Sequence, residues 1–132
     1  MNVLLDTNAY SALLRGDGAV ADCVSRANHV FISSIVAGEL IYGFRAGARF
    51  RRNMADLNEF LENPYVTFLP VTLVTADRFG RIAADLRAKG RPIPTNDIWI
   101  AAHATETGAD LVSFDRHFAA IDGLAWIDPS EP

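Results

Sequence analysis

The apolar residues of this chain fall into short continuous runs, separated by longer stretches in which they recur every three or four positions. The runs occupy residues 2–6, 29–33, 66–71, 109–114 and 124–127. Runs of this length without regular polar alternation are typical of strands covered on both faces. The pattern therefore predicts a sheet of four to five strands, with residues 124–127 as the shortest.

Between the strands the spacing of apolar residues indicates amphipathic helices. Three such sets are Val20, Cys23, Val24 and Ala27; Met54, Leu57 and Leu61; and Phe79, Ile82, Ala83 and Leu86. They follow the i, i+3, i+4, i+7 rule for one face of a helix. Strands that alternate with helices favour an α/β fold, a three-layer α/β/α sandwich on a mainly parallel sheet. No internal repeat or linker divides the chain, so we expect a single domain over residues 1–132.

Composition narrows the class of protein. Half of the residues are hydrophobic and 21% are charged, which is a globular balance. A single cysteine excludes a disulfide framework and suits a reducing compartment. The first apolar run is too short for a signal peptide, and no run approaches the roughly 20 apolar residues of a membrane span. We expect a cytoplasmic protein without membrane contact.

The net charge of −4 argues at first against a nucleic-acid partner, because phosphate contacts need lysine and arginine. The distribution of the basic residues changes this picture. Residues 45–52 hold four arginines and no acid, and a second basic group runs from Arg78 to Arg91. Arginine suits bidentate binding of phosphate, although for either group alone a solvated helix face is the better explanation.

Four acidic residues follow the predicted strands or begin a predicted helix. They are Asp6, Glu39, Asp97 and Asp115. Each alone has a structural explanation, as a helix cap, an exposed helix position, a partner of a helix dipole and a turn residue. Ligand sites of parallel sheets gather at the carboxyl ends of the strands, where all four would meet. Carboxylates packed together repel one another unless a cation neutralises them, and carboxylate oxygens suit Mg²⁺ or Mn²⁺.

Local features near these acids lead to further expectations. The helix that carries Glu39 is apolar or small on both sides of the acid, so we expect it to face the core nearly all round. Thr95 or Asn96 is expected to cap the helix of Asp97.

The sequence gives less support to a zinc site, a phosphate-binding loop or covalent catalysis. Cys23 is alone and the three histidines are widely separated, so no zinc-ligand spacing is present. We expect Cys23 to pack in the core. His117 is expected to pack or cap its own turn, although it lies near enough to Asp115 to reach a substrate. The chain has no GxxxxGK[ST] phosphate loop and no arrangement that suggests covalent catalysis.

Around these acids the sequence resembles the PIN-domain ribonucleases, and among them the VapC-type toxins of prokaryotic toxin–antitoxin pairs. The matching segments are residues 3–8, 33–40, 95–104 and 111–118, in the order and approximate spacing of the family. Each segment alone is weakly specific and the four together are strongly so. The resemblance covers essentially the whole chain.

The resemblance implies a metal-dependent endoribonuclease that cuts RNA with Mg²⁺ or Mn²⁺. It implies catalytic metal ligation by Asp6, Glu39, Asp97 and Asp115, the last at the family's most variable acidic position. It also implies polar support from Thr7 or Asn8 near Asp6, and from Asn96. A cognate antitoxin and a homodimer are the partners expected on the same ground.

Alternatives of other classes remain at this point. A signalling receiver domain would carry adjacent acids after the first strand and a lysine after the last, whereas this chain has one acid there and Lys89 before Pro92. A housekeeping RNA-processing nuclease, or a non-catalytic RNA- or protein-binding module, would keep the same fold. The aromatic segment Ile41, Tyr42 and Phe44 is a candidate anchor for a partner helix, with core packing as the alternative.

Overall fold

A five-stranded parallel sheet forms the centre of the molecule. The computed structural model describes residues 1–131, in which the strand order is β3-β2-β1-β4-β5 and every pairing is parallel. The strands are β1 (Asn2–Leu5), β2 (His29–Ser33), β3 (Val66–Leu69), β4 (Asp110–Val112) and β5 (Trp126–Ile127). The strand order differs from the 2-1-3-4-5 order of flavodoxin-like folds, which include receiver domains.

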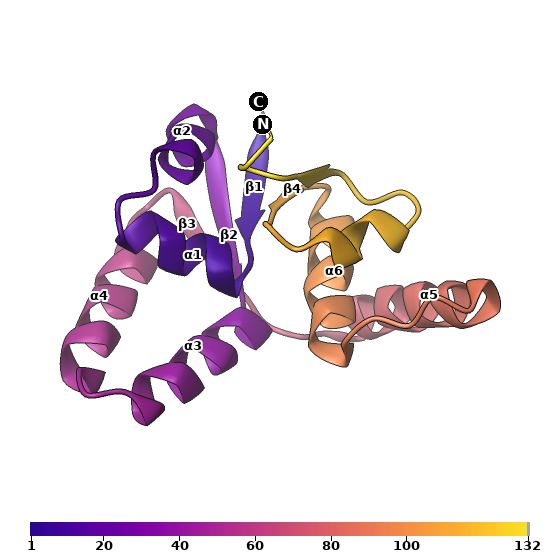
Figure 1. Ribbon diagram of the computed structural model, residues 1–132, viewed down its shortest axis with the longest axis horizontal. Helices are drawn as coiled ribbons and strands as arrows, with labels where there is room; N and C mark the ends of the chain where they lie inside the picture. The colour runs from indigo at the N-terminus through magenta and orange to yellow at the C-terminus, as the bar shows by residue number, and fades with distance from the viewer. Residues whose placement is uncertain (132) are drawn as a thin grey trace.

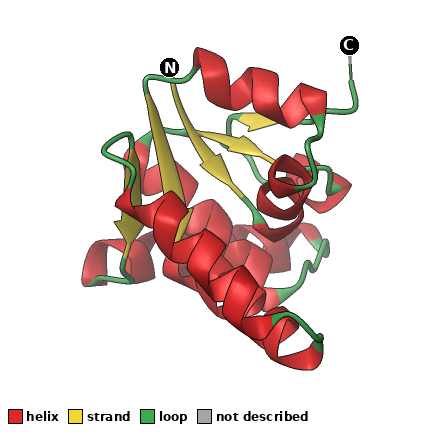
Figure 2. Cartoon of the chain, turned by 90° about the vertical axis from the view of Figure 1, so that its left-hand side faces the viewer, coloured by secondary structure: helices red, strands yellow, loops and turns green. Residues whose placement is uncertain are grey.

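Helices cover both faces of this sheet. They are α1 (Thr7–Leu14), α2 (Gly18–Arg26), α3 (Ser34–Ala46), α4 (Phe50–Glu62), α5 (Leu73–Lys89), α6 (Thr95–Thr107) and the short 3-10 helix η1 (Arg116–Ala120). Figure 1 shows α1 to α4 on one side of the strands and α5 and α6 on the other. The view of Figure 2 shows the strands fanned between these two groups of helices. The predicted three-layer α/β/α sandwich is confirmed.

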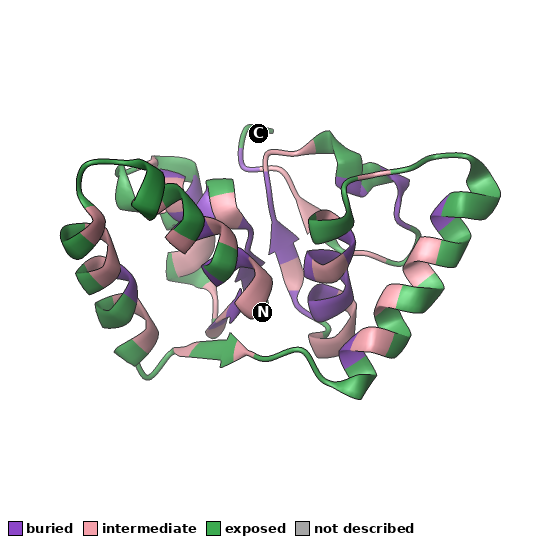
Figure 3. Cartoon of the chain, turned by 90° about the horizontal axis from the view of Figure 1, so that it is seen from below, coloured by how far each residue is buried: buried purple, intermediate pink, exposed green. Residues whose placement is uncertain are grey.

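The core explains why the strands read as continuous apolar runs. Val3, Leu4 and Leu5 of β1 are fully buried, because this strand pairs with β2 on one side and β4 on the other. Parallel strands covered on both faces need apolar side chains in both directions. Figure 3 shows the buried residues concentrated on the central strand and on α6, while α4 and α5 are largely exposed. The site-bearing helix α6 is therefore held firmly.

The structure corrects several boundaries and one burial prediction. The strand predicted over 66–71 ends at Leu69, because Pro70 has no N–H with which to continue the ladder. The runs 109–114 and 124–127 give strands of only three and two residues. The helix of Glu39 was expected to face the core nearly all round, which is wrong: it buries Val36, Ala37 and Leu40 and leaves its other side exposed.

No helix within residues 1–131 is long and apolar enough to cross a membrane.

Candidate active site

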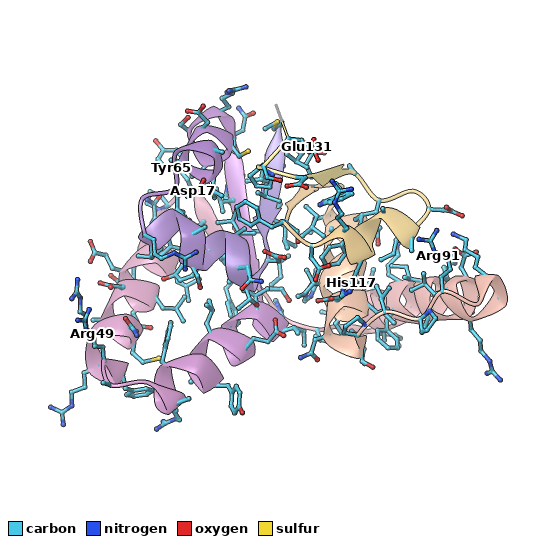
Figure 4. All side chains as sticks on the ribbon, in the orientation of Figure 1. Asp17, Arg49, Tyr65, Arg91, His117 and Glu131 are labelled. Atoms are coloured by element: carbon cyan, nitrogen blue, oxygen red, sulfur yellow. The ribbon has the colours of Figure 1, made fainter. Side chains whose placement is uncertain are left out.

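The carboxyl ends of β1, β2 and β4 meet at one edge of the sheet, and a cleft of about 300 Å³ opens there. Its lining comprises Asp6, Thr7, Asn8, Glu39, Pro94, Asp97, Ile100, Asp115 and His117. All four acids that the sequence singles out therefore lie in one cleft. In Figure 4, His117 marks the cleft beside α6, near the middle of the molecule.

Asp6 joins β1 to α1 at the floor of the cleft. Its Oδ1 accepts a hydrogen bond from the Ala9 amide at 2.8 Å, and its Oδ2 accepts one from the Ser113 hydroxyl. Burial raises the pKa of Asp6 to about 6, against the lowering effect of these two hydrogen bonds. The charges of Asp97 and Asp115 raise the Asp6 pKa further. The carboxylate is thus both a helix cap and a member of the acidic cluster.

Ser113 is a site residue that the sequence analysis missed. It is fully buried at the end of β4, donates its hydroxyl to Asp6, and accepts the backbone N–H of Asp115 at 2.9 Å. One hydroxyl therefore fixes two of the acidic positions relative to each other. The signal in the sequence was a polar residue, Ser113, between the apolar residues Val112 and Phe114.

Glu39 projects into the cleft from α3. Ser33 caps this helix by accepting the Ile35 amide at 3.0 Å, which sets where the helix begins after β2. The Glu39 carboxylate accepts from the Thr7 hydroxyl at 2.5 Å and from the Asn96 amide at 3.3 Å. The resemblance placed Thr7 near Asp6, whereas here its hydroxyl holds Glu39. Exposed Asn8 lines the cleft as well.

Asp97, Asp115 and His117 form the open side of the cleft. The His117 Nδ1 lies 3.0 Å from Asp115 Oδ1 and 3.3 Å from Asp97 Oδ2. Burial raises the pKa of Asp97, and the hydrogen bond with His117 partly opposes this. Asp115 also caps η1 by accepting the His117 amide at 2.9 Å, so its turn role is confirmed. The imidazole of His117 bridges two carboxylates, a contact that its expected turn role did not include.

The entry to α6 differs from expectation. The helix begins at Thr95 after Pro94, and no side chain caps it, so capping by Thr95 or Asn96 is wrong. Proline fits the start of a helix because its fixed φ is compatible with the first turn. Asn96 is thereby left free to reach Glu39, and Asp97 lies in the first turn as expected.

A buried histidine supports the cleft from behind. His103 of α6 is fully buried, with Nδ1 2.8 Å from the Ser33 hydroxyl and Nε2 3.0 Å from the Pro70 carbonyl. A carbonyl can only accept, so Nε2 donates its proton to Pro70, and Nδ1 shares a hydrogen bond with the Ser33 hydroxyl. His103 thus connects the helix of Asp97 to the cap of the helix of Glu39. In the sequence, His103 stands alone, far from the other two histidines, and no pattern indicates this role.

The donor set fits a divalent cation. Asp97, Asp115 and His117 each offer one ligand atom, and these atoms lie within 4.8 Å of one another. No lysine or arginine is present among the described residues that line the cleft, and His117 is the one basic side chain there beside four carboxylates. Carboxylate oxygens are hard ligands suited to Mg²⁺ or Mn²⁺.

This fold and cleft define a class of protein: an α/β sandwich with clustered acids at the carboxyl edge of its parallel sheet. The chain belongs to the PIN domain family, which it matches over residues 3–124.

Curated relatives and a solved structure agree with this family. The chain is 35% identical over 129 residues to Ribonuclease VapC2 of Haemophilus influenzae, covering 94% of this chain and 95% of that protein. It is 34% identical over 94 residues to the tRNA(fMet)-specific endonuclease VapC of Shigella flexneri, covering 70% of each. Its structure resembles that of VapBC-1 from nontypeable Haemophilus influenzae with a TM-score of 0.87 and 29% identity, covering 99% of this chain and 100% of the other.

Proposed function

We propose that this chain is an endoribonuclease that hydrolyses RNA phosphodiester bonds and is the toxin of a toxin–antitoxin pair, acting as one PIN domain over residues 1–132. The observation that carries the proposal is the meeting of Asp6, Glu39, Asp97 and Asp115 in one cleft. The family, the 35% identity to a VapC ribonuclease and the likeness to VapBC-1 support it.

In this proposal the four carboxylates hold Mg²⁺ or Mn²⁺. When bound, the ion supplies charge neutralisation at the phosphate and lowers the pKa of a bound water. The chain's own residues orient the ligands: Ser113 fixes Asp6, while Thr7 and Asn96 fix Glu39. His117, half exposed between Asp97 and Asp115, is placed to hold or donate a proton at Nδ1.

The proposed partner is an antitoxin that blocks the cleft. Because the cleft is acidic, an inhibitor would present an arginine or lysine to it and replace the charge of the metal. Fewer residues can anchor the partner than the sequence suggested, because Ile41 and Phe44 pack against the core and only Tyr42 of the three is exposed. A homodimer remains part of the proposal on the ground of the family.

Two experiments test the function. Purified protein is incubated with single-stranded RNA and with transfer RNA in Mg²⁺ or Mn²⁺, with Glu39→Gln as the inactive variant. Glu62→Gln is the matched control, because Glu62 is an exposed acid at the end of α4, outside the cleft lining. Cleavage by wild type and by the control, but not by Glu39→Gln, is expected. Full activity of Glu39→Gln would contradict the site.

Expression in cells tests the toxin role separately. The chain alone is expected to arrest growth, and co-expression of the product of the adjacent reading frame is expected to restore it. A harmless chain that still cleaves RNA in vitro would favour a housekeeping RNA-processing nuclease instead.

A further inference from the structure

A second hollow adjoins the acidic cleft along the exposed face of α3. It has a volume of about 630 Å³ and is lined by Ser34, Ile35, Gly38, Glu39, Tyr42 and Asn96. We call it the α3 hollow. Glu39 lines both the cleft and the α3 hollow. Thr7 and Asn96 each donate a hydrogen bond to one oxygen of this carboxylate. The Glu39 side chain, which separates the cleft from the α3 hollow, is therefore held in place.

One face of α3 forms most of the hollow. Ile35, Gly38, Glu39 and Tyr42 stand at i, i+3, i+4 and i+7, the spacing that brings side chains to the same side of a helix. At Gly38 no atom lies within 4 Å of the place where a side chain would begin, so the backbone is open to the hollow. The hollow therefore has an open glycine position between an acid and an aromatic ring.

Tyr42 is the most exposed tyrosine, phenylalanine or tryptophan among residues 1–131. The residue is 79% exposed, and its ring takes part in none of the aromatic pairs of those residues. An exposed aromatic ring gains free energy when it stacks on another planar group, because the contact removes apolar surface from water. The residue lies one turn of α3 beyond Gly38 and lines the α3 hollow, which shares Glu39 with the acidic cleft.

We propose that the α3 hollow binds an unstacked base of the RNA substrate, with the ring of Tyr42 stacked on that base while the adjoining phosphate occupies the acidic cleft. This inference rests on the proposed function. Single-stranded RNA is recognised by proteins that stack its splayed bases on aromatic side chains.

The chemistry of the lining favours a base over the RNA backbone. The described lining contains no lysine or arginine that could bind a phosphate, and Glu39 would repel one. A neutral base meets neither difficulty. The Ser34 hydroxyl and the Asn96 amide supply hydrogen-bonding groups that can reach its edge.

The first test separates substrate binding from the chemical step. Initial rates of cleavage of a single-stranded RNA are measured for wild type, Tyr42→Ala, Tyr42→Phe and Tyr65→Ala. Tyr65 is the matched control, because it is 67% exposed and precedes β3 at the opposite end of the sheet (Figure 4). Tyr42→Ala is expected to raise KM roughly 5- to 150-fold with little change in kcat, the range for loss of one base–aromatic stack. Tyr65→Ala should behave like wild type, and Tyr42→Phe, which keeps a ring that can stack, should raise KM far less than Tyr42→Ala.

The second test asks what the ring touches and does not depend on cleavage. The binding of an RNA with one abasic position, scanned along the strand, is compared with the binding of intact RNA. Both are measured in Asp97→Asn protein and in the double variant that also carries Tyr42→Ala. At one position, loss of the base should weaken binding to Asp97→Asn protein and should have no further effect on the double variant. If wild type cleaves no RNA, this coupling would still support the base site while the proposed nuclease function fails.

Two outcomes would overturn the inference. One is equal KM for wild type and Tyr42→Ala, or no abasic position that couples to Tyr42. The other is a Tyr42→Ala protein that cleaves RNA normally yet no longer binds its antitoxin, which would assign the hollow to a protein side chain.

Discussion

Replacing Asp6 by asparagine should stabilise the metal-free protein at neutral pH while it abolishes cleavage. Asp6 is only 6% exposed and its pKa is raised from 3.8 to about 6, mainly by burial. Asparagine has the same shape, caps a helix equally well, and carries no charge to bury. The substitution therefore removes the cost of the ionised group without creating a cavity.

The magnitude follows from the shift in pKa. A group whose pKa is higher in the folded protein favours folding while it is protonated, and this advantage is lost as pH rises from the unfolded value of 3.8 through about 6. One unit of pKa corresponds to about 1.4 kcal/mol, so the ionised Asp6 costs the folded state about 3 kcal/mol at pH 7. Below pH 4 the two proteins should be similarly stable.

Urea unfolding in EDTA, at a series of pH values from about 4 to about 7.5, measures this difference directly. Asp17→Asn is the control, since Asp17 also caps a helix through backbone amides but lies outside the cleft. The gain from Asp6→Asn should grow with pH, and Mg²⁺ should reduce it by binding only the wild type. A gain that is independent of pH, or a variant that is less stable than wild type at pH 7, would refute the reasoning.

Three further outcomes are expected. EDTA should abolish RNA cleavage and either Mg²⁺ or Mn²⁺ should restore it, with Ca²⁺ a poor substitute because it prefers more ligands in looser geometry; cleavage that persists in EDTA would contradict the metal site. Ser113→Ala should raise the Asp6 pKa further and shift the Mg²⁺ dependence of activity to higher concentration, at a cost to stability of about 1 kcal/mol; an unchanged Mg²⁺ titration would argue against its role. His103→Leu should lower the free energy of unfolding by about 1–3 kcal/mol for each buried group left without a hydrogen bond, which are the Ser33 hydroxyl and the Pro70 carbonyl. His103→Asn keeps a polar atom near the Nδ1 position and should lower it less. Equal losses for the two variants would show that Ser33 needs no partner.

Periodicity identified the layers of this fold because burial on both faces imposes it. Residues Val3 to Leu5 are all apolar because β1 is central, and this strand was placed within one residue. The short strands β4 and β5 were overextended, since apolar residues beside them pack in the core without belonging to the ladder. Apolar character alone does not distinguish a strand from a buried loop.

A topological rule brought the four acids to attention, but it could not identify their partners; only the family resemblance pointed to Thr7, Asn8 and Asn96, and nothing pointed to Ser113. Asp6, Glu39, Asp97 and Asp115 follow strands or start a helix, and parallel pairing takes such positions to one edge. The partners of these acids lie far away in sequence: Ser113 is 107 residues from Asp6 and Asn96 is 57 from Glu39. Such pairs depend on register and on helix rotation, which a pattern of apolar residues does not specify. The same limit hid the exposure of Tyr42, because α3 is rich in small and apolar residues around its full circumference.

The central place of β1 in the sheet has a consequence for synthesis of the chain. Asp6 leaves the ribosome 107 residues before Ser113, yet β1 pairs with β4, and Ser113 and Asp115 follow that strand. At the usual rate of roughly 5–20 residues per second, roughly 5–20 s separate the two parts of the site. A nascent chain that stops before β4 holds neither Ser113 nor Asp115 and cannot assemble the cleft. On the proposed function, the nascent chain cannot act as a nuclease until β4 and the two residues Ser113 and Asp115 have been made, and an inhibitor has to be ready at that moment and not earlier.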